Sequence, residues 1–318
     1  MKAIFAPERR PIFATAAVCL VLYVVAVGLY PRIGTFHVFF DFFTDNAFLG
    51  VIAVGLTLVI LTGGIDLSVG TMSACASVIS ATLITKKGLP PLVAFGAACL
   101  FGILVGATQG FLIARFKLAP FLVTLGGLFF CRGIALLISR ESISIDHPFL
   151  EALGTPALKI LGGKITWSAL FYVATAVVMA FVLKQTRFGR TLYAIGGSAP
   201  SAHLMGFPVQ RTITLAYVTS GLFAALGGIL YTVYTSSSGD LGGPTRELDA
   251  IAAVVIGGTL LSGGAGSILG TVMGILTIAI VQTGIDFHGN LSSWWGKIAI
   301  GTLLLVFVLL QRWFSGKS

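Results

Sequence analysis

Charged side chains are scarce in this sequence of 318 residues. They make up 10% of it, whereas about a quarter is usual in soluble domains. Eleven acidic and 20 basic residues are too few to cover a soluble globule of this size, so a soluble enzyme is excluded. Disorder is excluded because 56% of the residues are hydrophobic. The 40 glycines follow no collagen-like period. The class that remains is an all-α polytopic bundle of transmembrane helices.

Residues that could carry out catalysis are also scarce. There are four cysteines and four histidines. No two cysteines stand at metal-ligand spacing, and the histidines fall at predicted loops or span ends. No phosphate-cradling sequence of the G-x-x-x-x-G-K-[ST] type occurs, so we expect no ATP hydrolysis by this chain alone. The sequence therefore predicts no catalytic residue, no metal and no cofactor held by the chain itself.

Basic residues outnumber acidic ones, and the formal net charge is +9. No basic run is interleaved with aromatic residues, so nucleic acid is not expected as a partner. The excess instead indicates the lysine and arginine bias of cytoplasmic loops. With the N-terminus in the cytoplasm, the internal segments hold more of these residues than the external ones. This orientation, with an even number of spans, predicts that both termini are cytoplasmic.

Long apolar runs predict about ten membrane-spanning helices. The first run is expected to be retained as an anchor rather than removed as a signal peptide. Most joints between runs are short, so residues 1–318 should form a single transmembrane domain. The predicted spans are 11–30, 46–63, 67–85, 90–114, 119–138, 166–184, 212–234, 248–264, 268–285 and 294–311.

Two loops are longer and more polar than the others, and such loops are where partners usually bind. The segment 139–165 is predicted outside and the segment 185–211 inside. Within the second, Gly196-Gly197 predicts a helix break. Ser198 is a suitable N-cap, and Gly206 followed by Pro208 is a suitable stop for a short helix. A docking element and an ordinary amphipathic connector both fit this pattern.

Two glycine-rich sequences resemble each other. Leu61–Gly70 reads LTGGIDLSVG and Leu261–Gly270 reads LSGGAGSILG. They indicate either two related halves, as in many transporters, or a chance similarity in a glycine-rich chain. Breaks near 63–66 and 257–264 favour a substrate path, because discontinuous helices often line one. The candidate residues for the path or for helix breaks are Gly63, Gly64, Asp66, Ser68, Gly126, Gly127, Gly257 and Gly258.

Two ionisable residues fall at predicted membrane depth. Asp66 is either a coupling-ion or proton site or the N-cap of the third span, and the cap is favoured. Arg132 lies within the fifth predicted span, so it should face protein or water and pair with an acid or with loop carbonyls.

Several of these sequences together resemble the permeases of bacterial ATP-binding-cassette (ABC) sugar importers of the ribose and galactose type. The matching sequences are GGIDLSVG at Gly63–Gly70, RFGRTLYAIGG at Arg187–Gly197 and ELDAIAAVVIGGTLLSGGAGS at Glu247–Ser267. Three more are similar to one branch, one of the two permeases of the galactofuranose importer. They are Thr44–Ile60, Glu141–Pro148 and Ser292–Gly301.

The resemblance implies partners and a coupling site. Such a permease pairs with a second, often different, permease chain, receives sugar from a periplasmic binding protein, and is driven by separate ATPase subunits that bind ATP and magnesium. Its loop between the sixth and seventh spans docks into the ATPase. Ser198 and Ala199 stand where family members commonly have a polar pair such as Asn-Glu. The contact residues that the resemblance implies are Gly189, Arg190, Tyr193, Ala194, Gly196, Gly197, Ala202, Met205 and Gly206.

We therefore predict the multi-pass inner-membrane subunit of an ATP-driven sugar importer, with galactofuranose or a related pentose or hexose as substrate. The external segments 141–148 and 240–249 should face the binding protein, with their acids against its basic groups. The alternative is an ion-coupled secondary sugar transporter with Asp66 or Asp286 as proton carrier. A scaffolding membrane subunit without a solute path is a second alternative.

Overall fold

The computed structural model describes the chain except for residues 1–9, 161, 239–245, 290, 293 and 316–318. The described part is almost entirely helical. Its helices are α1 (Arg10–Leu29), the 3-10 turn Pro31–Gly34, α2 (Phe36–Asp45), α3 (Ala47–Leu61), α4 (Val69–Thr85), α5 (Pro91–Phe116), α6 (Pro120–Ile138), α7 (Pro148–Gly154), α8 (Trp167–Gln185), α9 (Arg187–Leu204), α10 (Val209–Thr235), α11 (Arg246–Ile256), α12 (Ile268–His288) and α13 (Trp294–Ser315). An antiparallel hairpin of β1 (Pro156–Ile160) and β2 (Gly163–Thr166) precedes α8.

Within the described residues, five helices are long and apolar enough to cross a membrane, namely α5, α6, α8, α10 and α12. A sixth span results if α2 and α3, which meet at a bend of 56°, are counted as one broken span. Shorter apolar helices lie in α1, α4 and α13. The predicted class, a helical membrane bundle, is confirmed.

Helix α3 forms the centre of the bundle. Of its 15 residues, all except Phe48 are buried. It packs against α8, α10, α11 and α12, and α10 in turn packs against α4 and α5. An α-helix forms its backbone hydrogen bonds within itself. Because α3 is also apolar on every side, it can lie at the centre of a membrane bundle.

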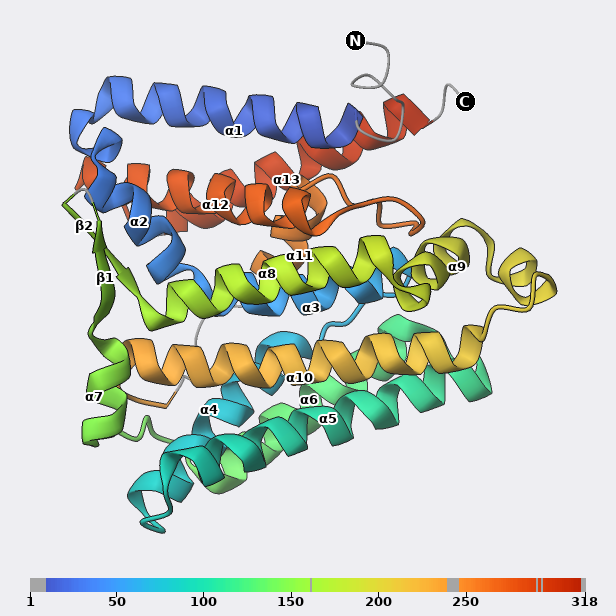
Figure 1. Ribbon diagram of the computed structural model, residues 1–318, viewed down its shortest axis with the longest axis horizontal. Coiled ribbons are helices and arrows are strands. Elements are labelled where there is room, and N and C mark those ends of the chain that lie inside the picture. The colour runs from blue at the N-terminus through green and yellow to red at the C-terminus, as the bar shows by residue number, and fades with distance from the viewer. Residues whose placement is uncertain (1–9, 161, 239–245, 290, 293, 316–318) are drawn as a thin grey trace.

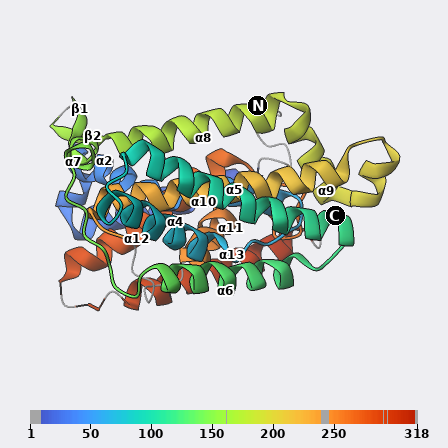
Figure 2. The same ribbon diagram turned by 90° about the horizontal axis from the view of Figure 1, so that it is seen from below.

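The two ends of the bundle differ (Figure 1). Helix α9 projects beyond one end, toward which α1 begins and α13 ends. The opposite end carries α2, α7 and the β1–β2 hairpin. Figure 2, seen from below, shows the same projection of α9 beyond the long helices.

One predicted span is interrupted in the structure. We expect a helix over 248–264, but α11 ends at Ile256, and Gly257–Ser267 is irregular. Gly258 takes a left-handed backbone with φ of 87°, which stops the helix. The break expected near 257–264 is therefore confirmed, and it interrupts the span predicted over 248–264. In contrast, α6 runs unbroken through Gly126 and Gly127, so these two glycines break no helix.

The break in α9 lies one or two residues later than expected. The chain stays helical through Gly196 and Gly197 and breaks at Ser198, whose φ and ψ are −165° and 105°. The Ser198 hydroxyl oxygen accepts a bond of 3.3 Å from the Ser201 backbone N–H, as the predicted N-cap requires. The following helix ends at Leu204, and Gly206 beyond its C-cap has a φ of 81°. The short capped helix predicted here is confirmed.

Candidate functional site

Helices α3 and α11 end with the same backbone geometry. After α3, the N–H groups of Gly63 and Gly64 donate to the carbonyls of Ile60 and Val59, and Gly63 has a φ of 79°. After α11, the N–H groups of Gly258 and Thr259 donate to the carbonyls of Val255 and Val254. Both ends are Schellman motifs, in which a glycine in the left-handed conformation lets the last carbonyls find donors.

The matching helix ends support a repeat with a shifted correspondence. A serine precedes each of the next helices, Ser68 before α4 and Ser267 before α12, but only the Ser267 hydroxyl caps its helix, by accepting the Gly270 backbone N–H at 3.0 Å. Near these starts the predicted alignment of the two glycine-rich sequences holds within one residue. At the preceding helix ends, however, Gly63 corresponds to Gly258 rather than to Gly263, because the second break is longer than the first.

The two breaks meet each other directly. The backbone N–H of Gly264 donates to the carbonyl of Leu61, at 3.0 Å. A Cβ placed on Gly63 would lie 3.1 Å from the carbonyl oxygen of Ser262. Residues about 200 positions apart in the sequence are therefore joined backbone to backbone, which the absence of side chains on glycine allows.

Helix α9 packs into this contact. A Cβ on Gly196 would overlap the carbonyl oxygen of Leu61 and the backbone N of Gly264. The Tyr193 hydroxyl donates to the carbonyl of Gly266, at 2.9 Å. We call Leu61, Gly63, Gly196, Gly263 and Gly264 the glycine junction.

A buried polar cluster lies beside the first break. Asp66 is fully buried. Its carboxylate accepts the Ser68 backbone N–H at 3.0 Å, the Ser68 hydroxyl at 2.6 Å and the Ser220 hydroxyl of α10 at 2.9 Å. The Gln109 amide of α5 donates to the Ser68 hydroxyl. Ser68 directly precedes α4, but its side chain makes no capping bond. The capping acceptor is the Asp66 carboxylate, which accepts the Ser68 backbone N–H as the favoured prediction requires, and which also ties the break to α10.

The residues proposed for coupling divide into two groups. Gly189 and Ala202 are buried, and Tyr193, Ala194 and Gly196 are half-buried, so these residues shape the element. The exposed members, which a partner can reach, are Arg190, Gly197, Met205 and Gly206.

Leu204, which the sequence reasoning missed, is 87% exposed beside Met205 at 65%. Two large apolar side chains at the tip of a projecting element form a surface suited to a protein partner. The signal available in the sequence was two neighbouring large apolar residues, Leu204 and Met205, directly before the helix stop Gly206-Phe207-Pro208.

The paired glycines of α6 have unequal surroundings. A Cβ on Gly127 would overlap the Gln109 amide and approach Ser68, so Gly127 borders the polar cluster. A Cβ on Gly126 would meet nothing within 4 Å.

Charges gather around the first turns of α11. Glu247 is buried against Gly70 of α4 and lies close enough to Arg132 of α6 for coulombic attraction. Among the described residues no salt bridge joins Arg132 to an acid, so the pairing expected for it is met only by this longer-range attraction. Asp249 forms an ion pair with Lys297 of α13. Since Glu247 and Asp249 are both buried, the expectation that they face a binding protein is wrong.

The external segment 141–148 pairs with the chain after α10. The N–H of Ile145 donates to the carbonyl of Ser236, and the N–H of Ser238 donates to the carbonyl of Ile143. The other predicted external segment is 240–249, and its residues 240–245 lie outside the described residues.

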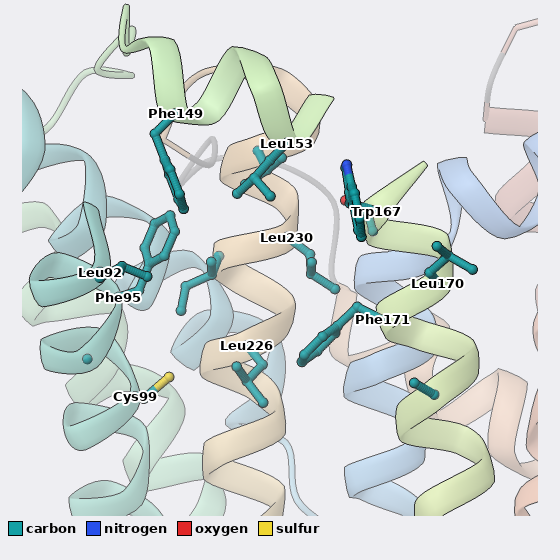
Figure 3. A pocket seen from close by; sticks show the side chains of 15 residues that line it. Leu92, Phe95, Cys99, Phe149, Leu153, Trp167, Leu170, Phe171, Leu226 and Leu230 are labelled. Carbon is teal, nitrogen blue, oxygen red and sulfur yellow. The ribbon is translucent and has the colours of Figure 1, made fainter. Parts of the chain in front are cut away.

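A groove of about 530 Å³ opens between α5 and α8 (Figure 3), with α10 as its floor and α7 across one end. Phe95, Phe171 and Leu226 point into it. Its lining is apolar apart from Ser168 and the Trp167 indole N–H. A sugar would lose the hydrogen bonds of its hydroxyl groups there, at a cost of roughly 1–3 kcal/mol each, so this groove is unsuited to a sugar path.

Comparisons with known proteins agree with the helical bundle and its breaks. Residues 38–308 match the family described as "branched-chain amino acid transport system / permease component". The chain is 46% identical over 306 residues to the inner membrane ABC transporter permease protein YjfF of Escherichia coli, covering 96% of this chain and 92% of YjfF.

Two further relatives have sugars in their names. The fructose import permease FruG of Bifidobacterium longum is 38% identical over 320 residues, covering 97% of this chain and 93% of FruG. The ribose import permease RbsC of Bacillus subtilis is 39% identical over 268 residues, covering 83% and 81%. No solved structure matches the chain.

The fold and these matches define a class, the inner-membrane permease subunit of an ABC importer. The chain belongs to the family of branched-chain amino acid transport system permease components, in the branch of the ABC sugar permeases. Membership in this family implies that a permease functions together with an ATPase, a binding protein and a second permease. The resemblance to ABC sugar permeases seen in the sequence is confirmed.

Proposed function

We propose that this chain forms the membrane path of an ATP-driven importer for a monosaccharide that a periplasmic binding protein delivers. ATP and magnesium bind to a separate ATPase subunit, and a second, related permease chain completes the membrane unit. The glycine junction carries the proposal, because it joins the exposed element α9 to both interrupted helices. A displacement of α9 by a partner would therefore move the breaks after α3 and α11, which are the segments best placed to line a substrate path.

The proposed topology has ten crossings, made by α1, α3, α4, α5, α6, α8, α10, α11, α12 and α13. The end with α9 faces the cytoplasm, and so do both termini. The basic residues near that end support this orientation, for example Arg115 in the last turn of α5 and the exposed Arg187 and Arg190 of α9.

The ATPase contact is proposed for the exposed face of α9. Leu204 and Met205 would fill an apolar pocket of the partner, and Arg190 would pair with an acid at its rim. Apolar anchors surrounded by polar contacts are typical of such interfaces.

The substrate is proposed to be a furanose or a related pentose or hexose, with galactofuranose as the first candidate. Support comes from the sequence similarity and from relatives whose names specify ribose and fructose.

The structure favours this proposal over proton coupling through Asp66. Three hydrogen-bond donors surround the Asp66 carboxylate, and the side chain is fully buried. These contacts suit a fixed strut better than a group that exchanges protons with both sides. Asp286 is exposed and remains the alternative carrier.

The test is uptake into proteoliposomes, with the ATPase, binding protein and second permease encoded by neighbouring genes added or omitted. Labelled galactofuranose, ribose and fructose are compared. We expect uptake to require ATP and all added subunits. Uptake by this chain alone under a pH gradient would overturn the proposal.

A further inference from the structure

A cluster of aromatic and charged side chains lies near the end of the bundle opposite α9. Four elements contribute to it. They are the last residue of α2, the start of α3, the last turns of α10 and the first residue of α11. We call it the outer cluster, and its members are Asp45, Phe48, Tyr231, Tyr234 and Arg246.

Aromatic rings make up the body of the outer cluster. The Phe48 ring meets the Tyr231 ring edge-on, with 5.2 Å between centroids, and lies 6.4 Å from the Tyr234 ring. The Arg246 guanidinium lies over the Tyr231 ring, 3.6 Å from its centroid, and 5.5 Å from that of Phe48. This stacking holds the guanidinium by its face, whereas its N–H donors point along its edges.

A carboxylate marks the rim of the outer cluster. The Tyr234 hydroxyl donates to Asp45 Oδ1, at 3.2 Å. This bond uses one of the several acceptor positions of a carboxylate. Asp45 is exposed and Tyr234 is 49% exposed, whereas Phe48, Tyr231 and Arg246 are half-buried. The cluster is therefore open at the rim and closed at depth.

This composition matches what a sugar presents. A sugar ring has apolar C–H faces, which pack on aromatic rings, and hydroxyl groups on its edges, which need both donors and acceptors. Here Tyr234 is the accessible ring, Asp45 the accessible acceptor, and Arg246 the planar donor fixed below them. The apolar groove between α5 and α8 offers no such combination.

We propose that the outer cluster binds the sugar on its way into the permease, with the ring on Tyr234 and hydroxyl groups on Asp45 and Arg246. The ligand class is a free monosaccharide rather than the binding protein. The inference deepens the proposed function and rests on it, because it assigns the first site that the sugar meets in this chain.

The first test is saturation-transfer NMR on the assembled permease–ATPase complex without binding protein, with free ribose, fructose and methyl galactofuranoside as probes. Transfer to the C–H protons of one sugar is expected for the unaltered complex. Asp45→Asn alters an exposed acceptor and should weaken sugar affinity about tenfold, the usual effect of losing one polar contact to a charged group. Tyr234→Phe keeps the ring but removes the hydroxyl that holds Asp45 in place, so it should weaken sugar affinity by a smaller factor.

Tyr30→Phe is the matched control. The Tyr30 hydroxyl also makes one exposed hydrogen bond, to His288 at 2.7 Å, where α1 and α12 end. Its loss should leave sugar affinity unchanged. Arg246→Lys keeps the charge over the ring but loses the planar donor edge, so sugar affinity should fall while the thermal unfolding temperature stays near that of the unaltered complex.

The outcomes separate the inference from the proposed function. ATP-dependent uptake with no saturation transfer, or with equal affinity in Tyr234→Phe, Asp45→Asn and Tyr30→Phe, would overturn the inference alone. A fall in the unfolding temperature of Arg246→Lys without a change in sugar affinity would show that the stack only anchors α11. Uptake without ATP would overturn the proposed function.

Discussion

The two helix breaks share a backbone design but are held in place differently. Thr62–Ser68 contains Asp66, whose buried carboxylate binds Ser68 and Ser220. In Gly257–Ser267, Gly263, Gly264 and Gly266 have positive φ values. That break is held mainly by backbone contacts and by Tyr193 of α9. The first break is thus fixed to α10 by side chains, whereas the second depends on the glycine junction and on α9.

This difference suggests a division of labour. The break tied to α10 is a fixed reference within the bundle, and the break tied to α9 follows the element that a partner can reach. Gly196 packs against Leu61, the last residue before the first break, and against Gly263 and Gly264 of the second, so any movement of α9 acts on the contact between the two breaks.

The largest effect is expected from Gly196→Ala, which disturbs the contact common to both breaks. The added Cβ would overlap backbone atoms of Leu61 and Gly264, which cannot rotate away as a side chain would. We expect a loss of about 3 kcal/mol in stability and at least a tenfold fall in ATP-driven uptake. Thermal unfolding in detergent and proteoliposome uptake measure the two quantities.

Gly197→Ala is the matched control, since a Cβ there meets nothing within 4 Å. Its stability should stay within about 0.5 kcal/mol of the unaltered chain. Equal behaviour of the two variants would contradict the backbone contact at Gly196.

Asp66→Ala removes what only the first break has. The N–H and hydroxyl of Ser68 and the hydroxyl of Ser220 lose their acceptor, at a cost of about 2 kcal/mol. Asp66→Asn keeps one acceptor oxygen and should retain most of the uptake. If Asp66→Asn abolishes uptake while the unfolding temperature is unchanged, the carboxylate carries protons and is more than a strut.

Replacing Leu204 and Met205 together with serine tests the exposed tip of α9 without touching either break. Both side chains are exposed, so bundle stability should change by less than about 0.5 kcal/mol. Binding of the ATPase should weaken about tenfold, because apolar anchors dominate such contacts. Surface plasmon resonance on the solubilised permease measures this affinity. Unchanged affinity would place the ATPase contact elsewhere.

The smallest effect is expected from Tyr193→Phe, which affects only the second break. It removes the bond to the Gly266 carbonyl, worth about 1 kcal/mol. Burial raises the pKa of Tyr193, so the hydroxyl keeps its proton at every pH below its ordinary value of about 10. The contribution of this bond is lost only as the pH rises through the raised pKa. The difference in unfolding temperature between the unaltered chain and Tyr193→Phe should therefore be constant from pH 6 to about pH 9. A difference that varies within this range would contradict the hydrogen bond assigned to the Tyr193 hydroxyl.

The sequence was informative where apolar length or capping chemistry decides the structure. The limits of α5, α6 and α8 follow from apolar runs between prolines, glycines and polar residues. The capped helix after Ser198 follows from its serine and glycine. Local chemistry determines such features, so a single sequence reveals them.

The sequence was uninformative where distant segments decide the structure. The break in α9 was expected at Gly196-Gly197 but lies at Ser198. The sequence does not show that Gly196 is there to pack against Leu61 and Gly264, because these residues are far away in the chain. The glycines of Gly257–Ser267 predict a break, but the sequence does not show that this break packs against Leu61 and Gly196, which belong to distant segments. The outer cluster was missed for the same reason, since its members come from four separate elements.

The most direct test of the account is hydrogen–deuterium exchange on the permease in nanodiscs, with and without the ATPase subunit. If the glycine junction joins α9 to both breaks, ATPase binding at the tip of α9 will slow exchange in α9 and also in Thr62–Ser68 and Gly257–Ser267. Slower exchange confined to the exposed residues of α9, with both breaks unchanged, would contradict the central claim that this element is coupled to the interrupted helices.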